Sequence, residues 1–121
     1  MSGVEWLVDV HGCRENLLQQ PDVIVALFER IVARMQLRPI GRPRWHQFPG
    51  TRGLTAVWML QESHLTVHTF PEFGSASLNL FCCTSRPAPD WAELVGEPLA
   101  GSGVRVQELT RHYGPPEGAS R

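Results

Sequence analysis

The alternation of apolar and polar residues along much of the chain predicts a series of short strands. The first expected strand is 4–10, where Trp6, Val8 and Val10 alternate with Glu5 and Asp9. Further strands are expected at 45–48, 54–61, 64–70, 75–83 and 104–109. Because short connections separate the three strands between residues 54 and 83, antiparallel pairing is the simplest arrangement.

A different period between residues 21 and 35 predicts a helix. Apolar residues recur there at spacings of three and four, and Pro21 suits the first turn of a helix. A second, short helix is expected at 90–95, and the tail 114–121 is expected to fray. The order of elements predicts a single α+β domain over residues 1–121, with helices on one face of a mainly antiparallel sheet.

Composition excludes several functional classes. The formal net charge is −1 and arginines are interspersed with carboxylates, so no basic surface for nucleic acid is expected. No apolar run is long enough to cross a membrane, and the first residues do not resemble a signal peptide, so a cytoplasmic protein is expected. All 11 basic residues are arginine, which excludes a lysine-bound pyridoxal phosphate.

The segment Gln61–Glu72 carries the candidate chemistry. As a strand, it places His64, His68 and Phe70 on one face, and Leu65, Val67 and Thr69 on the other. Two histidines on one face of a strand could act as metal ligands, as general bases, or as hydrogen-bonded polar groups of the core. No metal site is expected, because the neighbouring Cys82 and Cys83 would point to opposite faces of a strand. The Gly-x-Ser-x-Gly turn that exposes the nucleophile of a serine hydrolase is absent from this segment, which argues against that class of enzyme.

The segment from Glu62 to Glu72, ESHLTVHTFPE, resembles the processing site of bacterial and archaeal S-adenosylmethionine decarboxylase proenzymes. The resemblance extends to HGC at 11–13, WHQF at 45–48 and FCC at 81–83, and so covers nearly the whole chain. It implies autocatalytic cleavage between Glu62 and Ser63 into a β chain, 1–62, and an α chain, 63–121.

The resemblance also implies roles for individual residues. Ser63 would become a covalent pyruvoyl group, whose ketone replaces the missing lysine by binding the substrate's amino group and accepting electrons. His68 would remove the Ser63 α-proton during processing, and Cys83 would protonate the product after loss of carbon dioxide. Glu72 would accept hydrogen bonds from the substrate's ribose, while Phe70 and Phe48 are candidate aromatic platforms for its adenine or sulfonium.

The function implied is decarboxylation of S-adenosylmethionine to S-adenosylmethioninamine for spermidine and other polyamines. Processed α/β protomers would pair into a homodimer, a four-layer αββα sandwich with two sheets face to face. The chain departs from the family pattern at Asn79, where aspartate is usual, and at Cys82 and Thr84, which flank the expected proton donor. A pyruvoyl-dependent ornithine or arginine decarboxylase and a non-catalytic partner protein therefore remain alternatives.

Overall fold

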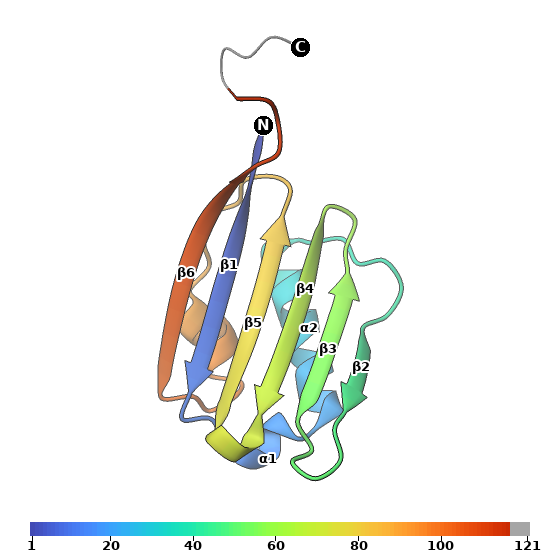
Figure 1. Ribbon diagram of the computed structural model, residues 1–121, viewed down its shortest axis with the longest axis vertical. Helices are drawn as coiled ribbons and strands as arrows, with labels where there is room; N and C mark the ends of the chain where they lie inside the picture. The colour runs from blue at the N-terminus through green and yellow to red at the C-terminus, as the bar shows by residue number, and fades with distance from the viewer. Residues whose placement is uncertain (117–121) are drawn as a thin grey trace.

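A six-stranded antiparallel sheet forms the framework of the protein (Figure 1). The computed structural model describes residues 1–116. In chain order the elements are β1 (Ser2–His11), α1 (Glu15–Leu18), α2 (Pro21–Met35), β2 (Arg44–Gln47), β3 (Leu54–Met59), β4 (Ser63–Phe70), η1 (Pro71–Phe73), β5 (Ser75–Cys82), η2 (Ala92–Gly96) and β6 (Gly103–His112). The strand order is β2-β3-β4-β5-β1-β6, so β1 lies between β5 and β6.

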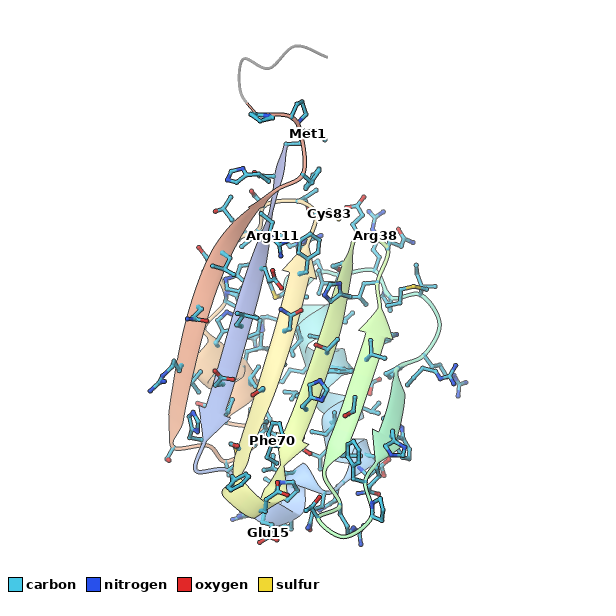
Figure 2. The ribbon with its side chains drawn as sticks, in the orientation of Figure 1. Met1, Glu15, Arg38, Phe70, Cys83 and Arg111 are labelled. Carbon is cyan, nitrogen blue, oxygen red and sulfur yellow. The ribbon has the colours of Figure 1, made fainter. Side chains whose placement is uncertain are left out.

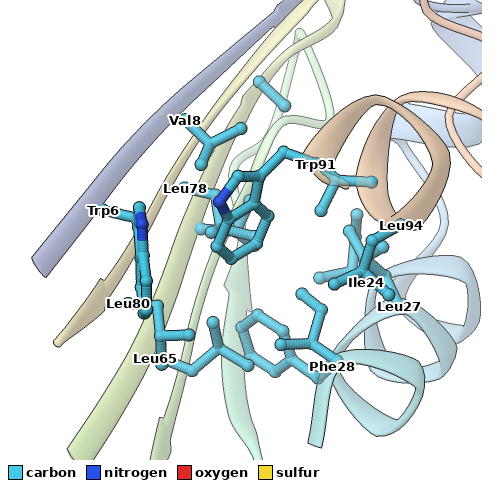
Figure 3. Packing of buried hydrophobic residues seen from close by; sticks show 14 of the residues in the cluster. Trp6, Val8, Ile24, Leu27, Phe28, Leu65, Leu78, Leu80, Trp91 and Leu94 are labelled. Atoms are coloured by element: carbon cyan, nitrogen blue, oxygen red, sulfur yellow. The ribbon is translucent and has the colours of Figure 1, made fainter. Parts of the chain in front are cut away.

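The helices cover one face of the sheet because only that face is continuously apolar. On β4, Leu65 and Val67 are buried while His64 and His68 are exposed, as the alternation predicts. Helix α2 contributes a buried stripe that includes Leu27 and Phe28 and packs against the sheet (Figure 3). Burying one such side chain contributes about 1.5–3 kcal/mol relative to leaving it exposed.

The predicted α+β class is confirmed, and the predicted helix at 21–35 matches α2 residue for residue. Strand β6 is longer than predicted because it pairs with all of β1, from Ser2 opposite His112 to His11 opposite Gly103. The helix expected at 90–95 is a π-helical turn, Ala92–Gly96, and the four-residue α1 is too short for any periodic signal. Of the tail expected to fray, residues 117–121 lie outside the described residues.

The second face of the sheet is open in the single chain (Figure 1). Within residues 1–116, α1, α2 and η2 all lie on the opposite face. No helix in this part of the chain has the length and apolar character needed to cross a membrane. The open face therefore displays the second side-chain set of every strand, including His64, His68 and Phe70 of β4.

Candidate active site

A short turn through Leu60, Gln61 and Glu62 joins β3 to β4 and places Ser63 at the start of β4. The Leu60 amide donates a hydrogen bond to the Ser63 carbonyl at 3.0 Å and closes the turn. The Gln61 amide donates to the Arg38 carbonyl at 2.9 Å, which ties the turn to the segment after α2. Glu62 is exposed and Ser63 is half-buried, so the peptide between them lies at the surface of one end of the sheet.

Cys83 lies against this turn. Its amide donates a hydrogen bond to the Glu62 carbonyl at 2.8 Å, and its own carbonyl accepts one from the Tyr113 hydroxyl at 2.8 Å. Gly3 of β1 packs closely beside it, because a Cβ at Gly3 would lie 2.3 Å from the Cys82 carbonyl oxygen. The neighbouring strand and the segment after β6 thus hold Cys83 next to the Glu62–Ser63 peptide.

Ser63 and Cys82 are direct cross-strand partners and share the helix-covered side of the sheet. Burial raises the pKa of the Cys82 thiol, while the nearby Arg86 guanidinium and the Ser63 hydroxyl oppose that shift. Cys82 is buried and Cys83 is half-buried, as expected for neighbours on opposite faces of a strand. All three cysteines are free thiols.

A second group of predicted residues gathers at the opposite end of the sheet. His68, Phe70, Glu72 and Phe48 all line one cavity of about 280 Å³. His68 Nδ1 is hydrogen-bonded to Thr55 Oγ1 at 3.0 Å. Figure 2 shows Phe70 at this end and Cys83 at the other.

A pair of buried hydrogen bonds and an exposed aromatic contact hold this end together. The buried Thr69 hydroxyl donates to the Leu18 carbonyl and accepts from the Leu54 amide, both at 2.8 Å, and so links α1, β3 and β4. The Phe48 and His46 rings form a T-shaped pair with a centroid distance of 4.8 Å. No sequence pattern singles out Thr69, because both of its partners are distant in the chain.

The two groups do not meet within one chain. His68 follows Ser63 by five residues on the same strand, a separation of about 16 Å at strand geometry. Their side chains also point to opposite faces, since Ser63 pairs with Cys82 on the covered side and His68 lies on the open side. A chain's own His68 is therefore out of reach of its own Ser63.

Comparison with known proteins identifies the family. Residues 4–112 match the model of the S-adenosylmethionine decarboxylase family. The chain belongs to this family.

Individual relatives agree with that assignment. The S-adenosylmethionine decarboxylase proenzyme of Clostridium tetani is 33% identical over 109 residues, 87% of this chain and 82% of the relative. A second such proenzyme, from Halalkalibacterium halodurans, is 31% identical over 112 residues, 90% of this chain and 85% of the relative. The crystal structure of the adenosylmethionine decarboxylase from Aquifex aeolicus has the same fold, with a TM-score of 0.79, 24% identity, and coverage of 98% and 97% of the two chains.

Membership in the S-adenosylmethionine decarboxylase family confirms the resemblance found in the sequence, and with it the class of carboxy-lyases. The predicted sheet with helices on one face is likewise confirmed. The roles of Ser63, His68 and Cys83 and the pairing of two sheets stay predictions. Within residues 1–116 no group of three or more His, Cys, Asp or Glu side chains could hold a metal ion.

The open face of this family member also carries a series of linked polar side chains that the sequence did not reveal. His64 Nε2 is hydrogen-bonded to Asn79 Oδ1 at 3.1 Å, and Asn79 Nδ2 donates to Glu5 Oε2 at 2.7 Å. Glu5 also forms an ion pair with Arg111. The pKa of Glu5 is lowered below its usual value, mainly by the hydrogen bond from Asn79 and to a smaller extent by Arg111. These residues come from β4, β5, β1 and β6, so no local motif could join them.

Proposed function

We propose that the chain is a self-cleaving S-adenosylmethionine decarboxylase. It splits between Glu62 and Ser63 into chains 1–62 and 63–121, carries a pyruvoyl group at position 63, and makes S-adenosylmethioninamine for spermidine and polyamine synthesis. Its relatives' names, which describe proenzymes, support self-processing. The observation that carries the proposal is the hydrogen bond from the Cys83 amide to the Glu62 carbonyl, because it unites the cleavage bond with the expected proton donor.

This hydrogen bond can stabilise the negative charge that develops during the proposed cleavage. Attack of the Ser63 hydroxyl on the Glu62 carbonyl carbon replaces the peptide bond with an ester, and negative charge develops on the Glu62 oxygen. The Cys83 N–H already points at that oxygen from 2.8 Å, so it stabilises the charge without reorganisation. Removal of the Ser63 α-proton then expels the Glu62 carboxylate, and hydrolysis releases ammonia and leaves a ketone at position 63.

A pyruvoyl group suits the side chains present. The chain has no lysine that could hold pyridoxal phosphate, whereas the Glu62–Ser63 turn supplies a serine whose cleavage generates a carbonyl. When formed, this carbonyl supplies an electron sink for loss of carbon dioxide. Cys83 is half-buried and is held next to the Glu62–Ser63 turn through its amide and its carbonyl, which supports its proposed role as the proton donor.

The cavity at the other end of the sheet has the chemistry of a nucleoside site. Phe48 and Phe70 are 47% and 40% exposed, so part of each aromatic ring is accessible to a base or a sulfonium. Glu72 lines the same cavity and can accept two hydrogen bonds from a ribose diol. An amino acid substrate such as ornithine or arginine has no diol for Glu72, and this favours S-adenosylmethionine over the alternative substrates.

A second copy of the chain would complete the site. The open face exposes Val57, Met59 and Leu109 at 42%, 60% and 44%, apolar surface that suits burial against another sheet. A twofold axis between two stacked sheets, perpendicular to the strands, would set the Ser63 and Cys83 end of one copy against the His68 and Glu72 end of the other. Such pairing gives the αββα sandwich, and His68 of one copy would lie at the Glu62–Ser63 turn of the other, where it could remove the Ser63 α-proton.

The denatured intact mass of the purified protein tests this function. We expect two fragments divided after Glu62, the second lighter by one ammonia than a chain that begins with serine. Release of carbon dioxide from S-adenosylmethionine in preference to ornithine or arginine would then identify the substrate. A single chain of 121 residues that persists on long incubation would contradict the proposal and favour a non-catalytic partner.

A further inference from the structure

A second cavity, of about 320 Å³, lies directly at the β3–β4 turn, where we propose that the chain is cleaved. Glu62 and Ser63 form part of its wall, and Arg38 and Arg86 supply its only positive side chains among the residues that line it. This cavity is distinct from the candidate nucleoside cavity at the other end of β4. Figure 2 shows Arg38 at the same end of the sheet as Cys83.

Arg86 has donor capacity that the described part of the chain does not use. Its side chain is half-buried, and Nη1 donates to the Met35 carbonyl at 3.0 Å. Its Nε is fully buried and has no hydrogen-bond partner within residues 1–116. An unpaired N–H on a half-buried cation is costly, and an anion in the adjoining cavity would satisfy it.

Arg38 is fixed beside the same turn through its backbone. Its carbonyl accepts from the Gln61 amide, and the following residues continue the contact, with an antiparallel bridge between Pro39 and Leu60. The Arg38 side chain is exposed and, like that of Arg86, forms no ion pair with any residue that the structure describes. Two guanidinium groups that form no ion pair with a described residue thus line the same cavity as the Glu62–Ser63 peptide.

Cleavage would create an anion at this place. The peptide between Glu62 and Ser63 is neutral, but elimination breaks the bond between Ser63 Cβ and Oγ and leaves both oxygens on Glu62 as a carboxylate. The Glu62 side chain is a second carboxylate on the same residue. Helix α2 ends at the cavity with Gln36 as its C-cap, so its dipole adds partial negative charge. Without cations, this environment would oppose release of the carboxylate.

We propose that Arg38 and Arg86 form a binding site for the α-carboxylate of Glu62. They hold this carboxylate as it leaves Ser63, and afterwards they hold it as the new C-terminus of the 1–62 chain. The inference rests on the proposed self-cleavage, and it adds two residues that stabilise the leaving carboxylate in the elimination step.

The test is a time course of self-cleavage in freshly purified protein, followed by denatured mass. Arg38→Gln and Arg86→Gln are compared with the wild type, with Arg86→Lys, which keeps the charge, and with Arg42→Gln, which removes an exposed arginine away from this cavity. Neutral hydroxylamine is added to a parallel sample, because it splits the ester between Glu62 and Ser63 but leaves a peptide bond intact.

We expect elimination to slow by at least about tenfold in each glutamine variant, the effect of losing one charge-assisted hydrogen bond. The ester intermediate should then accumulate in the glutamine variants and be detected as protein that hydroxylamine cleaves. Arg42→Gln and Arg86→Lys should cleave themselves nearly as fast as the wild type. Cleavage of both glutamine variants at the wild-type rate, with no ester, would overturn the arginine site alone. Wild-type protein that never cleaves would refute the proposed function and the arginine site together.

A separate measurement isolates the structural role of Arg86 at the end of α2. In the uncleavable Ser63→Ala protein, Arg86→Gln should lower the melting temperature by less than it does in cleaved protein, because only the cleaved form holds the carboxylate. An equal loss in both forms would show that Arg86 merely caps α2, and would overturn its part in the site.

Discussion

The Cys83 amide is hydrogen-bonded to the Glu62 carbonyl at 2.8 Å, across the ends of β5 and the β3–β4 turn. One backbone contact thus connects the peptide bond that we propose is cleaved with the residue proposed to protonate the product. Its geometry depends on the exact approach of β1 to β5, since Gly3 packs against the Cys82 and Cys83 backbone. Changes that move these strands apart should therefore impair processing before they unfold the protein.

Gly3→Ala tests this dependence. The new methyl group would lie 2.3 Å from the Cys82 carbonyl oxygen, so the β1 and β5 backbones must shift. We expect self-cleavage to slow by about tenfold or more, because a displaced donor stabilises the developing charge poorly. The measure is the cleavage rate by mass. Gly103→Ala is the control, since no atom lies within 4 Å of its new Cβ, and an equal effect there would contradict the argument.

Complementation between two inactive variants tests the shared site. His68→Ala and Ser63→Ala should each stay uncut when expressed alone. When the two are expressed together, the His68→Ala chain should be cut after Glu62, because the Ser63→Ala partner supplies His68. Mass spectrometry distinguishes the two chains. Efficient cleavage of His68→Ala alone, or a monomer by light scattering, would refute a site built from two copies.

Glu72→Gln tests the assignment of the nucleoside cavity. Loss of one acceptor for the ribose should raise KM for S-adenosylmethionine by about tenfold while kcat changes little, since the diol lies far from the reacting carboxylate. Glu15→Gln, an exposed change on α1 near the same end of the sheet, is the matched control. An unchanged KM would remove Glu72 from the substrate site.

Thr69→Val tests the buried link between α1, β3 and β4. Valine keeps the shape but leaves the Leu18 carbonyl and the Leu54 amide without the Thr69 hydroxyl. The free energy of unfolding should fall by about 1–3 kcal/mol. Urea denaturation in the Ser63→Ala background keeps a single chain in both states, and Thr69→Ser should retain most of the stability. A valine variant as stable as its parent would contradict this role.

Glu5 should make stability depend on pH in the acid range. Its pKa is lower in the folded state than the ordinary value of 4.5, so its ionised form stabilises the fold above that value and the benefit is lost as pH falls below it. We expect Glu5→Gln to destabilise Ser63→Ala protein by about 1 kcal/mol near pH 7. The difference should vanish as pH falls towards about 3. A difference that does not change with pH would show that the Glu5 charge contributes nothing.

Local patterns predicted much of the fold correctly. The 3.6-residue period gave α2 its bounds, and alternation separated Leu65 and Val67 from His64 and His68, because each pattern depends only on which face of one element is buried. The patterns missed the full length of β6 because its ends are set by pairing with β1, over 90 residues away in the chain. They also could not connect Glu5 with Asn79 or Thr69 with Leu18.

The sequence by itself determined the family and the candidate residues, because the segment ESHLTVHTFPE and the motifs HGC, WHQF and FCC resemble those of S-adenosylmethionine decarboxylase proenzymes. Only the tertiary structure decided how these residues are grouped. Strand pairing brings Cys83 to the Glu62–Ser63 turn, while the length of β4 carries His68 and Glu72 to its other end. The reason is geometric. A strand is extended, so residues close in sequence become distant in space, and hydrogen bonds between strands bring distant residues together.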